Sequence, residues 1–245
     1  MTGRRSGRLG VGIVGAGRVG PVLGAALAGA GHALTGITAV SDASRERAAA
    51  MLPDVPILDI PAVLERSELV LLAVPEAALG ALVEGLAATG AWQQGQIVAH
   101  TAARYGTSIL APATAAGAIP LAIHPAMAFT GTSIDLARLP EAWFGVTAPV
   151  PVQPIGQALV LEMGGEPILI AERDREAYAE AISTVSSFSG AIIDQAVGLL
   201  RTIGVEQPGR VLGPLARSSL DDALTRAQPD SIDVAALREP GDELS

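Results

Sequence analysis

The segment Leu9–Gly20 constrains the fold more than any other part of this sequence, because an apolar run in it ends in a glycine-rich turn. The turn has the spacing G-x-G-x-x-G and opens into a helix-like stretch. The first glycine permits a tight turn out of a strand, the second lets a pyrophosphate approach the backbone, and the third lets the helix pack closely on the strand. This pattern predicts a dinucleotide-binding βαβ unit whose loop residues are Gly15, Ala16, Gly17, Arg18, Val19 and Gly20.

Apolar strands alternate with helical segments along the first 171 residues. After the turn, Val22–Ala30 is expected to be a helix and Ala33–Val40 the second strand. The fully apolar run LVLLAV at 69–74 is typical of a strand buried on both faces of a parallel sheet. We expect further strands at 56–58, 96–100, 118–123, 143–148 and 167–170, and helices at 61–67, 77–88, 105–116 and 152–163. This alternation predicts an α/β fold, a doubly wound, mostly parallel Rossmann sheet.

The sequence changes character after residue 171. From Asp174 no strand pattern is evident, and apolar residues recur at helical spacing in Ala177–Leu200 and Val211–Leu224. We predict a dinucleotide-binding Rossmann domain over 1–171 and a smaller all-helical domain over 172–245, with a loosely held tail from Pro229. These helices carry apolar residues on more than one face, which predicts a homodimer formed through the helical domain.

Charge and composition exclude several classes of partner. The chain is 49% hydrophobic, which is enough for a sizeable core, and its net charge of −9 repels nucleic acid and anionic membranes. Arg4, Arg5 and Arg8 are expected to lie in a solvated N-terminus rather than in a binding arm. The chain contains neither the apolar core of a signal peptide nor a run of about eighteen apolar residues. We therefore expect a soluble, cytoplasmic protein.

The absence of three residue types narrows the chemistry. The sequence contains no Cys, Lys or Asn, and all 16 basic residues are Arg. Thiolate nucleophiles, Schiff bases and catalysis by a lysine ammonium or an asparagine side chain are therefore excluded. The three histidines, at 32, 100 and 124, have no helical ligand spacing, so we expect no metal site.

The choice of cofactor depends on the residues that follow the second strand. An acidic side chain there would bind the ribose hydroxyls of NAD, whereas hydroxyls and arginines accommodate the extra phosphate of NADP. Ser41, Ser44 and Arg45 favour NADP, while Asp42 keeps NAD as the alternative. Ser44 or Asp42 could instead serve as the N-cap of a helix.

Polar side chains follow two of the later strands. Ligands in such sheets lie outside the carboxyl ends of the strands, so Val74, Pro75 and His100 are expected beside the cofactor. His124 ends a central strand, where its imidazole could donate a proton to a carbonyl oxygen, and Thr101 could bind the same oxygen.

These two candidates have structural alternatives. His124 could merely cap its strand, and Thr101 could be a helix N-cap. His32 precedes the second strand, and we expect it to be a loop residue without a role.

Four segments together resemble a known group of proteins. They are VGIVGAGRVGPVLGAALAGAGH at 11–32, LVLLAVPEAAL at 69–79, IVAHTAARYG at 97–106 and GAIPLAIHPAMAFTGT at 117–132. They look like Rossmann-like oxidoreductase proteins with a helical C-terminal domain of unknown function. That group is more distantly similar to deazaflavin-dependent NADP reductases and to pyrroline-carboxylate reductases, ketopantoate reductases and prephenate dehydrogenases.

The resemblance implies a role for one residue. Elsewhere the sequence departs from the pattern of these families. In prephenate dehydrogenases a similar His-Pro follows the equivalent strand, and its histidine bonds the substrate hydroxyl, so the resemblance gives this role to His124. Ketopantoate reductases rely on a lysine and an asparagine, which this chain lacks. The segment ERDREAYAEAI at 172–182 lacks the histidine expected after its tyrosine, and residues 226–230 replace an expected Gly-Pro and Arg-Gly-Asp run.

We therefore expect an NADP-dependent oxidoreductase that transfers a hydride between a nicotinamide and the carbonyl, hydroxyl or imine of a small anionic metabolite. The alternative is a dinucleotide-binding sensor or assembly protein without turnover. Both hypotheses require the glycine loop to bind a dinucleotide. A third, minor option is an α/β binding module that does not depend on a nucleotide.

Overall fold

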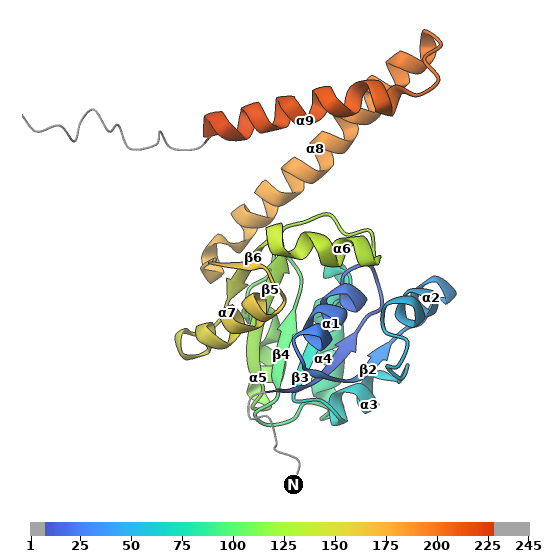
Figure 1. Cartoon of the computed structure of the whole chain (residues 1–245). Helices are drawn as coiled ribbons and strands as arrows, with labels where there is room; N and C mark the ends of the chain where they lie inside the picture. The colour runs from blue at the N-terminus through green and yellow to red at the C-terminus, as the bar shows by residue number, and fades with distance from the viewer. Residues whose placement is uncertain (1–7, 228–245) are drawn as a thin grey trace, which may run out of the picture. The chain divides into compact units, whose positions relative to one another are not determined.

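A computed structural model describes residues 8–227 as a seven-stranded sheet with helices on both faces, followed by two long helices (Figure 1). The strand order is β2-β1-β3-β4-β5-β6-β7. The strands are β1 Gly10–Val14, β2 Ala33–Thr38, β3 Leu69–Leu72, β4 Ile97–His100, β5 Ile119–Pro125, β6 Trp143–Thr147 and β7 Glu166–Leu169. All neighbours are parallel except β5 and β6, which pair antiparallel.

The helices lie between these strands and after the last of them. The α-helices are α1 Gly20–Gly29, α2 Asp42–Met51, α3 Ile60–Glu65, α4 Glu76–Ala88, α5 Ala111–Ala115, α6 Ser133–Arg138, α7 Gln153–Glu162, α8 Arg175–Thr202 and α9 Pro208–Ala227. The 3-10 helices are η1 Ser108–Leu110, η2 Leu139–Glu141, η3 Val150–Val152 and η4 Glu172–Asp174.

The alternation of side chains along the central strands divides the core into two layers. Leu69 and Leu71 of β3 point to the face covered by α1 and α7, whereas Val70 and Leu72 point to the face covered by α3 and α4. Each layer is a continuous apolar cluster of buried residues. A strand buried on both faces reads as an unbroken apolar run, as LVLL does here. The predicted doubly wound α/β fold is confirmed.

Several local expectations differ from the structure. The helix expected at 105–116 is shorter than predicted. It consists of η1 and α5 only, and residues 105–107 precede it. The strand expected at 56–58 is reduced to one bridge between Ile57 and Ile37. The short helix α6 was not expected at all. These segments are short, so tertiary contacts rather than local periodicity decide their conformation.

His32 is buried, and it joins three parts of the first unit. Its Nδ1 accepts a hydrogen bond from Leu9 N at 3.1 Å, and its Nε2 lies 2.8 Å from Glu162 at the end of α7. His32 lies in the loop before β2, as expected, and its contacts connect the start of the sheet to a covering helix.

The chain divides into two compact units, Met1–Ser183 and Thr184–Ser245. The first turns of α8 belong to the first unit, because Arg175 and Ala179 are buried in it. The expected loose tail from Pro229, and Arg4 and Arg5, lie outside the described residues. Within the part that is described, no helix is long and apolar enough to cross a bilayer.

Candidate functional site

The register of the sheet brings the predicted site segments to one edge. Val14 pairs with Leu72, Leu72 with His100, and His100 with Ala122. The glycine loop and the segments that follow β3 and β4 therefore begin at the same level of the sheet, next to His124 on β5. This edge is the carboxyl end of the parallel strands, where such sheets bind their ligands.

The glycine loop has the conformation that its spacing predicts. Gly15 has φ +111°, and its N–H donates to Thr38 Oγ1 at 2.9 Å. A Cβ on Gly20 would collide with the carbonyl oxygen of Gly15, whereas a Cβ on Gly17 would meet no atom within 4 Å. The fold thus requires Gly15 and Gly20, while the open space at Gly17 leaves room for a ligand. No side chain caps the start of α1. Pro21 has no N–H and Leu23 N donates to the Val19 carbonyl, so Gly20 and Val22 carry the first N–H groups that could face an anion.

A cavity of about 430 Å³ joins the glycine loop to the predicted catalytic residues. It is lined by Gly17, Arg18 and Val19 of the loop, Ala73, Val74, Pro75 and Glu76 after β3, Thr101 and Ala103 after β4, and His124. Of the predicted site residues, the structure brings together the loop, Val74, Pro75, Thr101 and His124. The cavity is large enough for the nicotinamide end of a dinucleotide beside a small substrate.

The end of β2 carries the residues expected to choose the cofactor. Val40 is 90% exposed, and Ser41 is the N-cap of α2, where its Oγ accepts from Ser44 N at 3.2 Å. Ser44 is buried and its hydroxyl donates to the Ser41 carbonyl, so it is turned away from the position expected for a phosphate. Arg45 is exposed, and Arg47 donates to the Ala16 carbonyl of the glycine loop at 3.2 Å.

His124 is bonded to a tyrosine from α8. Its Nδ1 lies 2.9 Å from the Tyr178 hydroxyl, and the two rings meet edge to face at 5.6 Å. Because Nδ1 faces Tyr178, the Nε2 edge of the imidazole is the one available to the cavity that His124 lines.

Arg175 is buried beneath this pair. Its guanidinium donates to Thr147 Oγ1 at 2.7 Å, to Gly145 O at 2.9 Å and to Ala122 O at 3.2 Å. It also lies 5.7 Å from the centre of the Tyr178 ring. Among the described residues no carboxylate lies within ion-pair distance of Arg175, so its hydrogen bonds are made to carbonyl and hydroxyl oxygens.

Burial and Arg175 together keep the site histidines neutral. Burial, then the charge of Arg175, lowers the pKa of His124 to about 4, although Glu76 acts in the opposite direction. The pKa of Tyr178 is raised by burial, against the opposing effects of Arg175 and a Gly145 backbone hydrogen bond. At neutral pH the cavity therefore faces a neutral imidazole.

His100 and Thr101 have different surroundings, although they are neighbours in the sequence. His100 is fully buried, its Nε2 lies 2.8 Å from Gly106 O, and its Nδ1 accepts from Ala102 N at 3.2 Å. Both ring nitrogens are therefore used within its own loop, and the structure does not bring His100 to the cavity. Thr101 does line it.

The HPAMAFTGT stretch folds from His124 back to the glycine loop. Asp135, buried at the start of α6, accepts from Thr130 N at 2.8 Å and Gly131 N at 2.7 Å. A Cβ on Gly131, whose φ is +81°, would lie 3.2 Å from the Cα of Arg18. The stretch thus links the catalytic candidate to the expected phosphate site.

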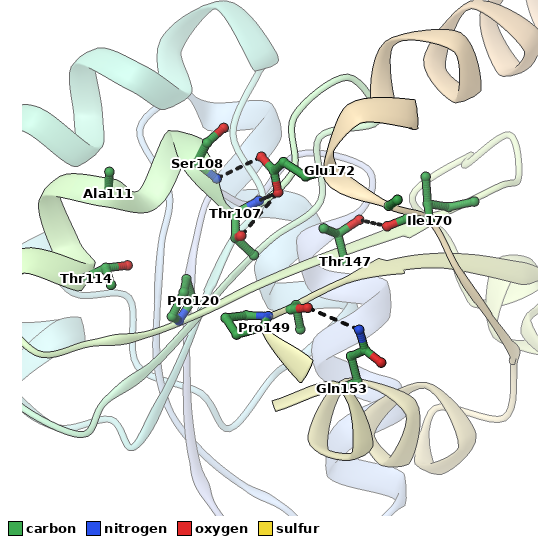
Figure 2. A pocket seen from close by; sticks show the side chains of 12 residues that line it. Thr107, Ser108, Ala111, Thr114, Pro120, Thr147, Pro149, Gln153, Ile170 and Glu172 are labelled. Atoms are coloured by element: carbon green, nitrogen blue, oxygen red, sulfur yellow. Dashed lines mark hydrogen bonds between the residues drawn. The ribbon is translucent and has the colours of Figure 1, made fainter. Parts of the chain in front are cut away.

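A second cavity of about 650 Å³ lies over η1, the end of β6 and the segment before α8 (Figure 2). Glu172 reaches from this segment and accepts from Thr107 N at 2.7 Å and Ser108 N at 3.0 Å. Burial would raise the pKa of Glu172, but hydrogen bonds from Ser108 and Thr107 outweigh it and lower the pKa. Neither the glycine loop nor a histidine lines this cavity, so we place the chemistry in the first one.

Glu76, Arg175 and Tyr178 belong to the site but were not predicted from the sequence. The signal that could have found the last two is their i, i+3 spacing at the start of a helix that follows the last strand, which puts both on one helix face. Within residues 8–227, no group of three His, Asp or Glu side chains could hold a metal ion.

Comparison with solved structures shows the fold. The chain superposes on protein BF3122 of Bacteroides fragilis, provisionally described as an NADP oxidoreductase, with TM-score 0.71 and 16% identity, covering 88% of this chain and 80% of that one. It superposes on 1-pyrroline-5-carboxylate reductase of Streptococcus pyogenes with TM-score 0.67 and 17% identity, covering 97% of this chain and 88% of that one. It superposes on a reductive aminase of Aspergillus terreus in complex with NADPH with TM-score 0.64 and 20% identity, covering 88% of this chain and 74% of that one.

Comparison with sequences identifies the family. No curated protein sequence matches the chain significantly. The family model described as a Rossmann-like domain matches residues 1–125, which is half of the chain, and a domain of unknown function, DUF2520, matches residues 142–233. The chain therefore belongs to the Rossmann-like domain family and carries a C-terminal DUF2520 domain.

Proposed function

We propose that this protein is a dinucleotide-dependent oxidoreductase that uses NADP and acts on the carbonyl, hydroxyl or imine of a small metabolite. The observation that carries the proposal is the single cavity in which Gly17 and the open start of α1 lie beside His124 and Thr101. A dinucleotide held on the loop would place its nicotinamide against these two side chains. The solved structures described above support the proposal through the names of the reductases among them.

The residues present fit the cofactor. Gly17 leaves open space where a pyrophosphate must approach, and the first N–H groups of α1 carry no side-chain cap. When bound, the cofactor supplies the hydride. His124 and Thr101 bind the reacting oxygen or nitrogen.

We further propose NADP rather than NAD. Ser41 and Arg45 present a hydroxyl and a guanidinium group just after the end of β2, and Ala39 and Val40 provide no carboxylate there. Asp42, in the first turn of α2, keeps NAD as the alternative.

The test is calorimetric titration of the full chain with NADPH, NADH and their oxidised forms. We expect micromolar binding, tighter for the phosphorylated pair. Gly17→Ala is expected to weaken NADPH binding at least about tenfold, because its methyl group occupies the space of the pyrophosphate. Stability should change by less than about 0.5 kcal/mol, since that methyl group meets no protein atom.

The matched control is Gly29→Ala, at the other end of α1, where a Cβ also meets nothing within 4 Å. It should leave binding unchanged.

Arg45→Ala should weaken NADPH binding without affecting NADH, and Arg210→Ala on α9 should affect neither. If none of the four dinucleotides binds, the glycine loop is only a turn and the proposal is wrong. Binding without oxidation of NADPH by any of a panel of keto acids and cyclic imines would favour a sensor.

A further inference from the structure

Two side chains at the start of α8 are built into the sheet beneath the candidate site. Arg175 and Tyr178 are three residues apart on a helix, so they share a face. Arg175 donates to the carbonyls of Ala122 on β5 and Gly145 on β6, which ties the helix to both strands. Tyr178 is therefore held in place by a neighbour as well as by its own contacts.

The ring of Tyr178 packs against the backbone at Gly145. Gly145 pairs with His124 across β5 and β6. A Cβ at position 145 would lie 2.9 Å from Cζ and 3.0 Å from the hydroxyl oxygen of Tyr178, closer than packing tolerates. The absence of a side chain on Gly145 thus lets the phenol reach His124 Nδ1 at 2.9 Å.

Resting on the proposed function, we propose that Tyr178 is a positioning residue and proton source for His124, fixing its ring with the proton on Nε2 so that the neutral imidazole donates to the substrate. The second element of the arrangement is Arg175, whose guanidinium stabilises the negative charge that Tyr178 acquires. Neither role belongs to a residue that lines the cavity.

The direction of the hydrogen bond follows from the acidities of the two groups. A phenol O–H is a stronger proton donor than the N–H of a neutral imidazole, and an unprotonated imidazole nitrogen is a good acceptor. Tyr178 therefore donates to Nδ1, and the ring proton occupies Nε2, on the edge that faces the cavity.

The proton transfer balances for reduction of a carbonyl. As hydride addition moves the C=O electron pair onto oxygen, that oxygen forms a bond to the Nε2 proton. The electron pair of the broken N–H bond stays in the ring, and Nδ1 takes the proton of Tyr178. The phenolate that remains lies beside the buried guanidinium of Arg175 and regains its proton from water. His124 never carries a positive charge in this sequence, in agreement with its lowered pKa.

The test is the ¹⁵N NMR spectrum of the imidazoles in the full chain. The chain has three histidines, and His→Gln variants assign their signals. We expect His124 to show a protonated Nε2 and a hydrogen-bonded, unprotonated Nδ1 at neutral pH. Tyr178→Phe keeps the ring and removes the donor, so the Nδ1 signal should shift and the two tautomers should mix. Gly145→Ala, which pushes the phenol away, should have the same effect.

The chain's other tyrosine provides the matched control, since Tyr105→Phe should leave the His124 spectrum unchanged. A wild-type His124 protonated on Nδ1, or a spectrum indifferent to Tyr178→Phe, would overturn the proposal. The outcome is separate from the fate of the proposed function, because NADPH titration tests that function and should be unaffected by Tyr178→Phe. With a substrate in hand, kcat should fall about 10²-fold at an unchanged KM for NADPH.

Discussion

His100 is buried and His124 is partly buried, and their hydrogen-bond partners give them different roles. His100 uses both ring nitrogens within its own loop, whereas His124 shares one with Tyr178 and turns the other toward the cavity. Each is kept neutral by its surroundings, with a pKa lowered to about 4. The first holds the loop after β4 in place, and the second is free to act on a ligand.

The lowered pKa of His100 predicts a pH-dependent stability. Burial is its main cause, and the folded protein therefore binds fewer protons than the unfolded chain between about pH 6.5 and about pH 4. The contribution is fully present above the unfolded pKa and is lost as the pH falls toward the folded pKa. It amounts to about 1 to 3 kcal/mol.

Urea denaturation at about pH 7 and about pH 4.5 checks this prediction. His100→Gln removes the titrating group, so the difference in free energy of unfolding between the two pH values should shrink by about 1 to 3 kcal/mol. The comparison is independent of any loss of stability that the variant shows at both pH values. Equal differences for wild type and variant would contradict the assignment.

Among the secondary-structure elements, the segment between β7 and α8 is held in place by two sets of hydrogen bonds. Glu172 accepts from the backbone of Thr107 and Ser108 (Figure 2). Arg175 is bonded to β5 and β6. A Cβ on Gly106 would collide with the Glu172 carboxylate, so this glycine leaves room for it. These contacts fix where α8 begins and therefore where Tyr178 lies.

Removing the carboxylate should loosen this segment. Glu172→Ala leaves two backbone donors without their partner and is expected to lower the free energy of unfolding by about 1 to 2 kcal/mol, a range that allows for the partial exposure of the carboxylate. Hydrogen exchange at the amides of Thr107 and Ser108 should become faster. Urea denaturation and exchange measured on the same sample check both effects.

Glu176→Ala is the matched control on the same stretch of chain. Glu176 makes an exposed ion pair with Arg104 at 3.7 Å, which is worth less than about 0.5 kcal/mol. The two variants should therefore differ clearly in stability. If they lose the same amount, Glu172 does not fasten the segment.

At the scale of the whole molecule, the helical unit has more apolar surface than it can cover. In α8 Phe188 and Ile192 are each 64% exposed, and in α9 Val211 and Leu215 are 57% and 62% exposed. A groove of about 510 Å³ between residues of the two helices is lined mainly by aliphatic side chains. Apolar surface gathered on one unit in this way marks an interaction site.

We expect a second copy of this chain to cover that surface, since its net charge of −9 disfavours an anionic membrane. Sedimentation should show a dimer at micromolar concentration. The double variant Ile192→Glu and Leu215→Glu should sediment as a monomer and still bind NADPH. Ile134→Glu, which places a charge on an exposed residue of α6, should remain dimeric. A monomeric wild-type protein would contradict this expectation.

The features of this protein that depend on neighbouring residues could be predicted from the sequence. A strand reads as an apolar run because both of its faces are buried, and the turn at Gly15 needs glycine because its φ is +111°. The Rossmann sheet, the glycine loop and the placement of Thr101 and His124 at strand ends follow from such local demands.

Which distant side chains meet at the site depends on how the chain packs in three dimensions. Tyr178 is 54 residues from its partner His124, and Arg175 bonds to carbonyls 53 and 30 residues away. The burial of His100 and the inward turn of Ser44 likewise depend on packing. Local periodicity states which face of an element is apolar, but the partner of a polar side chain is set by the register and packing of segments far apart in the chain.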